Sequence, residues 1–421
     1  MSSVTEAPPR NRWGIAAAGV VMQLALGAVY AWSVFVNPLR DRFDWSRTQV
    51  TLTFTISIFM LGATAYFGGL WMNRKGPRIV GMTAGVLYGI GVILASQSAD
   101  KLWLLYLSYG FIAGTGLGFG YIVPVATLVK WFPDRRGMIT GIAVCGFGGG
   151  AVLTAPIAKA LISNVGVLST FAYLGIAYLV MVVGAAWFMT NPPEGWKPAG
   201  WEPSAAQQTQ RSAKDYLLPE ALRTWQWYAL WALLFLNVTA GISLISQASD
   251  MTQEITGVSA TAGAALVSLI SIANAAGRFL WAWLSDFITR RWVFLTMFAL
   301  QAVLFLLLPQ ARAYALFSLL AFIIITCYGG GFGTMPAFAA DYFGPKNVGT
   351  IYGLMLTAWG VASAVGPLLL STLRDASGSY TQPLIIIAVI MLVSLIVPFI
   401  VRPPRPQIEA KEEVAPSPAS S

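Results

Sequence analysis

Apolar residues occur along this chain in long, nearly uninterrupted runs that short polar stretches separate. Each run is about 20 residues long or longer, which is the length an α-helix needs to cross the hydrocarbon core of a bilayer. The pattern predicts an all-α membrane protein with twelve transmembrane helices. The runs lie at residues 14–37, 50–72, 78–97, 102–129, 138–163, 167–190, 225–248, 257–284, 291–310, 313–340, 348–371 and 380–401.

The longest polar interval divides these runs into two sets of six. It covers residues 191–224 and is rich in Pro, Glu, Gln, Lys and Arg. The polar ends of the chain have the composition of disordered segments. We therefore expect an N-terminal tail at 1–13, a six-helix half at 14–190, a central loop at 191–224, a second six-helix half at 225–401 and a disordered tail at 402–421.

Composition supports a membrane protein. The 421 residues are 57% hydrophobic and 10% charged, with a mean hydropathy of +0.67, whereas soluble proteins average about 25% charged residues. The net charge of +9 does not indicate a nucleic-acid partner, because the basic residues lie in short loops beside the apolar runs. Histidine is absent from the sequence, and Cys145 and Cys327 both fall inside apolar runs. We therefore expect no disulfide framework, metal site or cofactor.

The loops also predict an orientation. If the N-terminus is cytoplasmic, 18 Lys and Arg residues lie on the cytoplasmic side and 6 on the opposite side. Positively charged loops remain in the cytoplasm. We expect both termini and the central loop to be cytoplasmic in a plasma (inner) membrane protein, and we expect a monomer.

The two halves repeat one another at an offset of about 212 residues. The string "GFGYIVP" at 118–124 matches "GFGTMP" at 331–336, and "GIAVCGFGGGAVLTAP" at 141–156 matches "GLMLTAWGVASAVGP" at 353–367. The loop "GLWMNRKGPR" at 69–78 matches "AWLSDFITRR" at 282–291. Two parallel six-helix repeats around a central site are typical of one large class of secondary transporters.

The repeated loop resembles the loop motif of the major facilitators, which is glycine, an acid, then arginine-x-glycine-x-basic. Asn73 stands where the first copy usually has its acid, and the second copy keeps Asp286. We interpret both copies as a gate in which basic residues pair with Asp134 or Asp341 across the cytoplasmic face and hold an outward-open state. The gate residues are Asn73, Arg74, Arg78, Asp286, Arg290 and Arg291.

Three further strings resemble the oxalate–formate antiporter family of the major facilitator superfamily. They are "LGAVYAWSVF" at 26–35, "VKWFPDRRGMITGIAV" at 129–144 and "NAAGRFLWAWLSD" at 274–286. The chain is also similar, more distantly, to the monocarboxylate transporters. This resemblance implies the major facilitator fold, with twelve helices in two six-helix halves, and the transport of small organic anions.

A single arginine lies deep in an apolar run. Arg278 precedes Asp286 by eight residues, about 12 Å along a helix, which places it near the bilayer midplane. A charge there costs at least ~2.5–3.5 kcal/mol. All 17 acids fall in loops, tails or the ends of runs, so we expect a substrate carboxylate as the partner of the planar guanidinium. The alternative is that Arg278 binds helix carbonyls and only joins the two halves.

Asn274 lies four residues before Arg278 and shares its helix face. It either orients the guanidinium, binds the substrate or forms a polar contact between helices. In the monocarboxylate transporters an aspartate commonly stands four residues before the equivalent arginine and is implicated in proton coupling. The neutral amide of Asn274 argues against that route. Asp250 and Glu254, just after the seventh run, are the remaining candidates for proton coupling.

Aromatic residues occur at the depth of Arg278 in several runs. A phenol can donate a hydrogen bond to a carboxylate while its ring excludes water, although each residue taken alone has helix packing as its alternative role. The oxalate–formate antiporter that defines the family has a lysine at the position of Trp359, and that lysine and the arginine together neutralise a dianion. One deep cation balances a monoanion instead. The candidates are Tyr30, Tyr121, Tyr328 and Trp359, with Phe119 and Phe332 beside them.

These features predict a secondary transporter of small organic anions, most simply monocarboxylates of the lactate, pyruvate or formate type. Neutralisation of Arg278 by the anion would permit occlusion, so exchange against a counter-anion is the natural mode, with proton symport as the alternative. An antiporter of the oxalate–formate type is a second hypothesis, and an exporter of drugs or amphipathic solutes ranks lower because it would favour a buried acid.

A membrane enzyme would need a nucleophile paired with a base, or a metal cluster. A receptor would more often carry a sizeable extramembrane domain, and neither class explains the repeat.

Overall fold

The computed structural model describes residues 11–203 and 214–404, and within these ranges every regular element is a helix. In the described residues, eleven helical stretches are long and apolar enough to cross a membrane. One of them, α3 (Arg47–Ala95), has 49 residues and is interrupted at Gly76, whose φ of 80° and ψ of 166° are not helical. At about 1.5 Å per residue α3 is twice the length of one crossing. The eleven stretches therefore make the twelve predicted crossings.

In the first half, α1, η1 and α2 together make one crossing, α3 makes two, and α4, η2 and α5 together make another. The expected boundaries agree with the observed ones to within six residues, the largest differences being the ends at Phe43 and Ser377. The elements are α1 (Arg12–Gly27), η1 (Ala28–Trp32), α2 (Ser33–Phe43), α3, α4 (Leu102–Leu105), η2 (Tyr106–Ala113), α5 (Gly114–Trp131), α6 (Arg136–Val165) and α7 (Val167–Ala186).

The second half follows the same plan but adds a short helix, α11, between its first two crossings. Asp250 and Glu254 belong to this helix. The elements are α9 (Leu218–Leu222), α10 (Trp225–Ser246), α11 (Ala248–Thr256), α12 (Ala260–Ile288), α13 (Arg290–Leu307), η3 (Leu308–Gln310), α14 (Tyr314–Phe343), α15 (Val348–Met355), α16 (Thr357–Ser377), α17 (Thr381–Ser394) and α18 (Ile396–Ile400).

Local sequence sets several helix starts. Ser46 and Gln49 form a reciprocal capping box at the start of α3, with Ser46 N–H donating to Gln49 Oε1 at 2.8 Å and Gln49 N–H donating to Ser46 Oγ at 3.2 Å. Ser259 accepts a hydrogen bond from the backbone N–H of Ala262 at the start of α12. These caps satisfy backbone donors that the first turn of a helix leaves free.

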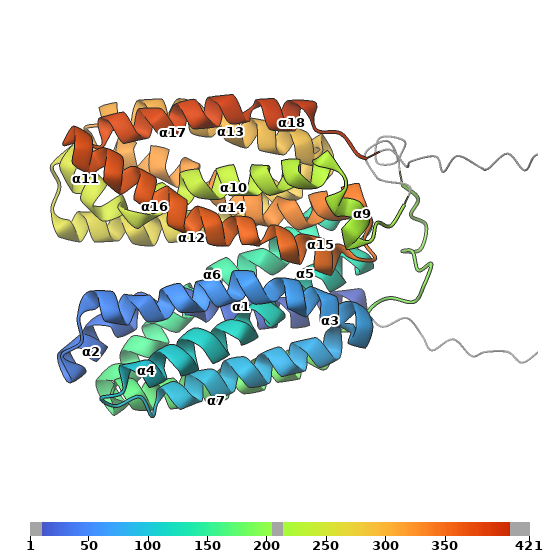
Figure 1. The fold of residues 1–421 in the computed structure, drawn as a ribbon, viewed down its shortest axis with the longest axis horizontal. Coiled ribbons are helices and arrows are strands. Elements are labelled where there is room, and N and C mark those ends of the chain that lie inside the picture. The colour runs from blue at the N-terminus through green and yellow to red at the C-terminus, as the bar shows by residue number, and fades with distance from the viewer. Residues whose placement is uncertain (1–10, 204–213, 405–421) are drawn as a thin grey trace, which may run out of the picture.

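The two halves form two bundles that lie side by side, one from α1 to α7 and one from α9 to α18 (Figure 1). Because successive crossings run in opposite directions, the starts of α1, α6 and α13 and the ends of α12 and α14 share one end of the molecule. This end carries Arg12, Arg136 and Arg290, and we call it the basic end. The main contacts between the halves are made by α6 with α12 and α14, and by α3 with α15; α5 also contacts α14 and α15, and α3 contacts α16.

The halves pack closely near the basic end and less closely away from it. A Cβ at Gly141 of α6 would lie 2.9 Å from the carbonyl oxygen of Arg278, so only glycine permits this approach to α12. Further from the basic end, large apolar residues of α6 become exposed, including Val152 and Ile157. Ser271 and Ile272 of α12 are exposed in the same way. The contact between α6 and α12 is therefore tightest from Arg278 to the basic end.

The central segment rests against both halves at the basic end. Trp131 at the end of α5 donates its indole N–H to the Thr190 carbonyl at 2.6 Å. Tyr216 donates its backbone N–H to the Phe343 carbonyl at the end of α14, at 2.9 Å. Residues 1–10, 204–213 and 405–421 lie outside the described residues. Most of the two predicted tails and the middle of the central loop therefore lie outside the described residues, and the predicted division of the chain stays a prediction. The helix α1 begins at Arg12, inside the range predicted for the N-terminal tail.

Candidate functional site

Arg278 lies at the contact between the two halves and is fully buried, with 0% of its surface exposed. Its Nε donates to the side-chain oxygen of Asn274 at 3.2 Å, and Nη1 donates to the Val144 carbonyl of α6 at 3.5 Å. Nη2 has no hydrogen-bond partner. No carboxylate forms an ion pair with Arg278 in the part of the chain that the structure describes. The guanidinium thus retains an unused donor and an unbalanced charge.

Aromatic rings surround this guanidinium. Its central carbon lies 4.8 Å from the centre of the Phe332 ring and 5.9 Å from that of Phe147. Trp359 packs edge-on against Phe332, with ring centres 4.8 Å apart. We call the connected set the aromatic cage. It comprises Tyr30 of η1, Tyr121 of α5, Phe147 of α6, Tyr328 and Phe332 of α14, and Trp359 of α16.

The hydroxyl groups of the cage differ in their partners. Tyr121 and Tyr352 have their hydroxyl oxygens 3.5 Å apart. The Tyr30 hydroxyl is buried beside the Arg278 guanidinium but makes no hydrogen bond of ordinary geometry, and an unsatisfied buried hydroxyl costs about 1–3 kcal/mol. An acceptor reaching both the Tyr30 hydroxyl and Arg278 Nη2 would satisfy two donors. A carboxylate has the two oxygens required.

The structure changes the predicted aromatic set at two positions. Phe119 packs edge-on against Trp71, with ring centres 5.9 Å apart, and none of its described ring contacts is with the cage. Phe147 belongs to the cage, although the sequence reasoning did not select it. The repeat contained a signal for it, because Phe147 in "GFGGG" is the counterpart of Trp359 at an offset of 212 residues.

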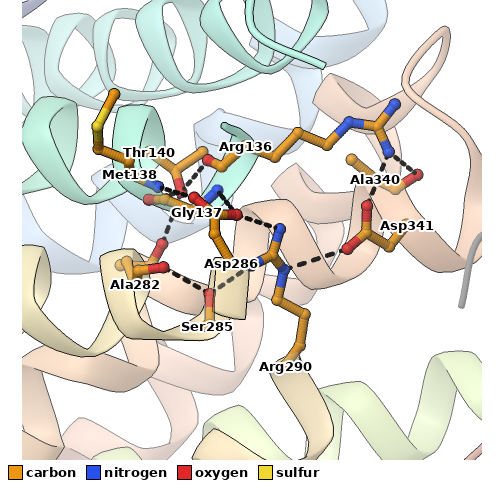
Figure 2. Close-up of polar contacts among 11 residues, drawn as sticks. Arg136, Gly137, Met138, Thr140, Ala282, Ser285, Asp286, Arg290, Ala340 and Asp341 are labelled. Atoms are coloured by element: carbon orange, nitrogen blue, oxygen red, sulfur yellow. Dashed lines mark hydrogen bonds and ion pairs between the residues drawn. The ribbon is translucent and has the colours of Figure 1, made fainter. Parts of the chain in front are cut away.

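A second polar cluster joins the halves at the basic end (Figure 2). Asp286 of α12 accepts hydrogen bonds from the backbone N–H groups of Gly137 and Met138, at 2.9 and 2.8 Å. These donors belong to the first turn of α6, where a carboxylate also interacts favourably with the helix dipole. A side chain of one half therefore caps a helix of the other.

Charges of alternating sign continue this cluster. Arg290 pairs with Asp286 at 2.8 Å and with Asp341 at 3.1 Å. Arg136 pairs with Asp341 at 2.8 Å. All four side chains are at most 15% exposed, so solvent screens these pairs weakly. We call Arg136, Asp286, Arg290 and Asp341 the interlock, because Arg136 belongs to one half and the other three belong to the second (Figure 2).

The pairing expected for the first loop is wrong. Asp134 pairs with Arg12 of its own half at 2.7 Å, and Asp341 pairs with members of the interlock. Arg74 is exposed, and the guanidinium of Arg78 lies 5.1 Å from the Trp187 ring. Asn73, which occupies the usual acid position, instead donates to Thr350 of α15 at 3.0 Å and to Asn347 at 3.3 Å. Its amide provides a neutral contact between the halves.

The remaining predicted residues lie elsewhere. Arg291 is beside the interlock but stacks on Trp292, with its guanidinium carbon 5.2 Å from the ring centre. Glu254 pairs with Arg374 at 3.1 Å and accepts the backbone N–H of Tyr380 at 3.2 Å. Asp250 is exposed one turn earlier on α11. Neither acid of α11 belongs to the aromatic cage or to the interlock.

Two six-helix bundles that meet at a buried arginine are typical of polytopic membrane transporters. The sequence model of the Major Facilitator Superfamily matches residues 15–249 and 230–421. This chain belongs to that superfamily. Its members are transporters, as the sequence predicted.

Curated relatives and a solved structure agree with this assignment. The oxalate:formate antiporter of Oxalobacter formigenes is 28% identical over 361 residues, which cover 85% of this chain and 83% of that protein. Monocarboxylate transporter 13 of Rattus norvegicus is 26% identical over 91% of this chain and 88% of that protein. The crystal structure of the transporter FucP in the outward conformation has a TM-score of 0.69 at 17% identity, over 91% of this chain and 97% of that one. This last likeness concerns the fold.

Proposed function

We propose that this transporter carries small monocarboxylates, with Arg278 and the aromatic cage as the binding site. The observation that carries the proposal is the unpartnered Nη2 of a fully buried arginine between the two halves. A desolvated cation–π contact contributes about 2 kcal/mol, whereas the effective penalty for an unpaired buried charge is several kcal/mol. A bound carboxylate supplies the missing charge and accepts the unused hydrogen bonds.

The same charge balance supports exchange as the transport mode. An empty carrier that closes around Arg278 retains the unpaired charge, whereas a loaded carrier does not. Return without cargo is therefore unfavourable, and a counter-anion on the opposite side promotes it. We place the basic end on the cytoplasmic side of the plasma (inner) membrane, because loops rich in Lys and Arg remain on that side. The interlock then closes the cytoplasmic side, which makes the described conformation outward-facing.

Proton symport through Asp250 or Glu254 is the alternative mode. It requires Glu254 to release Arg374 and Tyr380 when it takes up a proton. A second candidate function is exchange of a dicarboxylate for a monocarboxylate, which the relationship to the oxalate:formate antiporter favours. Trp359 argues against it, because this position of the cage carries no second cation.

Uptake into proteoliposomes tests the proposal. The purified protein is given radiolabelled lactate, pyruvate, formate or oxalate, each with and without an internal counter-anion and with and without an inward proton gradient. We expect saturable uptake of a monocarboxylate that an internal monocarboxylate accelerates. Uptake of oxalate alone would select the dicarboxylate function, and uptake of none of the four anions would refute the carboxylate proposal. Acceleration by the proton gradient alone would select symport.

A further inference from the structure

A second cluster of positive charge lines a cavity of about 410 Å³ at the basic end of the second half. The cavity lies between the start of α13, the end of α14 and the residues that follow α18. Arg290, Arg291 and Arg402 all contribute to its wall, and Asp341 is the carboxylate among the lining residues. Guanidinium groups around one cavity repel one another unless anions separate them.

Within residues 11–203 and 214–404, only one of these arginines pairs with carboxylates. Arg290 pairs with Asp286 and Asp341 in the interlock. Among the described residues, no carboxylate pairs with Arg291 or Arg402. Arg402 is exposed and Arg291 is partly exposed. The cavity therefore presents two positive charges to a ligand, and two guanidinium groups suit the oxygens of a phosphate.

The start of α13 adds to this preference. Thr289 is the N-cap residue of α13, and its side chain makes no capping hydrogen bond. The 18-residue helix thus begins at the cavity wall with its first-turn donors uncapped by a side chain. The N-terminus of a helix favours an anion through these donors and through the helix dipole.

The surroundings of the cavity indicate the source of the phosphate. Phe287 and Trp292, on either side of the α12–α13 junction, are 68% and 44% exposed. They lie at the ends of two membrane-spanning helices, which is the level of the headgroups in a bilayer. Basic pockets between helices at this level are suited to anionic headgroups. We propose that the cavity binds the phosphate of an anionic phospholipid, with Arg291 and Arg402 as its ligands.

Every residue that lines the cavity belongs to the second half. A phosphate between Arg291 and Arg402 cancels part of their mutual repulsion and joins the start of α13 to the residues after α18. The lipid therefore stabilises the folded second half, and it does so without contact with Arg278. This inference does not depend on which anion the transporter carries.

The test uses the full chain in nanodiscs of phosphatidylcholine, alone or with a minor fraction of phosphatidylglycerol. We compare the unmodified protein with Arg291→Gln/Arg402→Gln. The control is Arg135→Gln/Arg223→Gln, which removes the same charge from two exposed arginines of the basic end outside the cavity. We expect phosphatidylglycerol to raise the unfolding midpoint of the unmodified and control proteins by roughly 2–4 °C, and native mass spectrometry to show it retained. Both effects should be lost in the cavity variant.

Three results would overturn the inference. The first is an equal midpoint shift and equal lipid retention in the cavity variant. The second is an equal loss of both effects in the control variant, which would show that only general surface charge matters. The third is the same shift from soluble glycerol phosphate in discs of phosphatidylcholine alone, which would assign the cavity to a soluble anion. Should the double variant fail to fold, Arg402→Gln alone lies beyond the last helix and is expected to lose about half of the shift.

Discussion

At the scale of single residues, Arg278 poses the central energetic problem of this molecule. Its backbone is an ordinary part of α12, but its side chain is fully buried and lacks a carboxylate partner among the described residues. Asn274, the Val144 carbonyl and two aromatic rings compensate only part of the cost. Arg136 also keeps an unpartnered buried Nε, but it pairs with Asp341, whereas no described carboxylate pairs with Arg278. Under the proposed function, a bound carboxylate supplies that charge and accepts from Nη2.

The first prediction concerns the planar guanidinium of Arg278, which can donate two parallel hydrogen bonds. Arg278→Lys keeps the charge but loses the planar pair of donors that a carboxylate accepts. We expect kcat/KM for the best monocarboxylate to fall about 100-fold, which corresponds to roughly 2.7 kcal/mol. The measurement is initial uptake into proteoliposomes at matched protein density. Full activity in this variant would show that Arg278 acts only as a point charge, and full activity in Arg278→Ala would remove it from the site.

The second prediction concerns selectivity. Trp359→Lys adds a cation beside Phe332, close to the centre of the cage. Two cations balance a dianion better than a monoanion, so we expect the ratio of oxalate to formate uptake to rise at least about tenfold, or roughly 1.4 kcal/mol. Trp359→Gln is the control, because it removes the ring without adding charge. The same change of ratio in both variants would attribute it to lost packing rather than to charge.

The sequence predicted Arg278, Asn274 and most of the cage, because a charge or a hydroxyl-bearing ring at mid-depth in an apolar run is recognisable without coordinates. It did not predict the contact with the Val144 carbonyl or the place of Phe147. Both depend on the lateral position of α6 against α12. That position is set by the packing of one half on the other, which a one-dimensional pattern does not contain.

At the scale of helices, the junction before α13 is strained where its repeat counterpart is relaxed. Gly76 and Thr289 hold equivalent positions, with φ of 80° and 72°. Glycine adopts this conformation freely, whereas a β-branched residue rarely does. The strain costs about 1–3 kcal/mol. Thr289 also lines the cavity that we propose binds a phospholipid. The strained backbone is therefore part of that proposed site.

The third prediction follows from this pair. In neutral lipid, Thr289→Gly should stabilise the protein by about 1 kcal/mol, because the backbone strain is relieved and only part of the gain is offset by the entropy of glycine. Gly76→Thr should destabilise it by about 1–3 kcal/mol. Chemical unfolding in matched discs measures both. The two changes in the free energy of unfolding need not be equal in size. A lower free energy of unfolding in Thr289→Gly would show that the threonine side chain stabilises the protein by more than the backbone strain destabilises it.

The positions of the helices were largely predictable from the sequence. Run length and loop composition define where a membrane crossing begins and ends, and Ser46 and Ser259 mark two starts with side-chain caps. The short helix α11 was not predicted, since its nine residues are too few and too polar to resemble a crossing. The break at η1 was also missed, because "AVYAW" reads as a continuous apolar helix.

At the scale of the whole molecule, two sites act on the same motion. The interlock holds the halves together at the basic end, and Arg278 lies where the close contact between α6 and α12 ends. Rocking of the halves must break the capping of α6 by Asp286 and the pair between Arg136 and Asp341. In the proposed mechanism, the free energy of the interlock sets the balance between the two states, and an anion bound at Arg278 changes that balance by neutralising the charge at the interface.

The last prediction tests this balance. Asp286→Asn removes the charged cap of α6 and one partner of Arg290, and removal of one member of a buried ion pair costs about 3–5 kcal/mol. The cost applies only to the state closed at the basic end, because the same groups are hydrated once the halves separate. We therefore expect the closed population to fall more than tenfold relative to the open one.

Spin labels at Lys75 and Arg223, in a background without Cys145 and Cys327, report the distance between the halves. Asp134→Asn is the matched control, since Asp134 pairs with Arg12 inside one half and its loss should leave the distance distribution unchanged. An unchanged distribution in Asp286→Asn as well would mean that the glycine-mediated packing of α6 on α12, rather than the interlock, keeps the basic end closed.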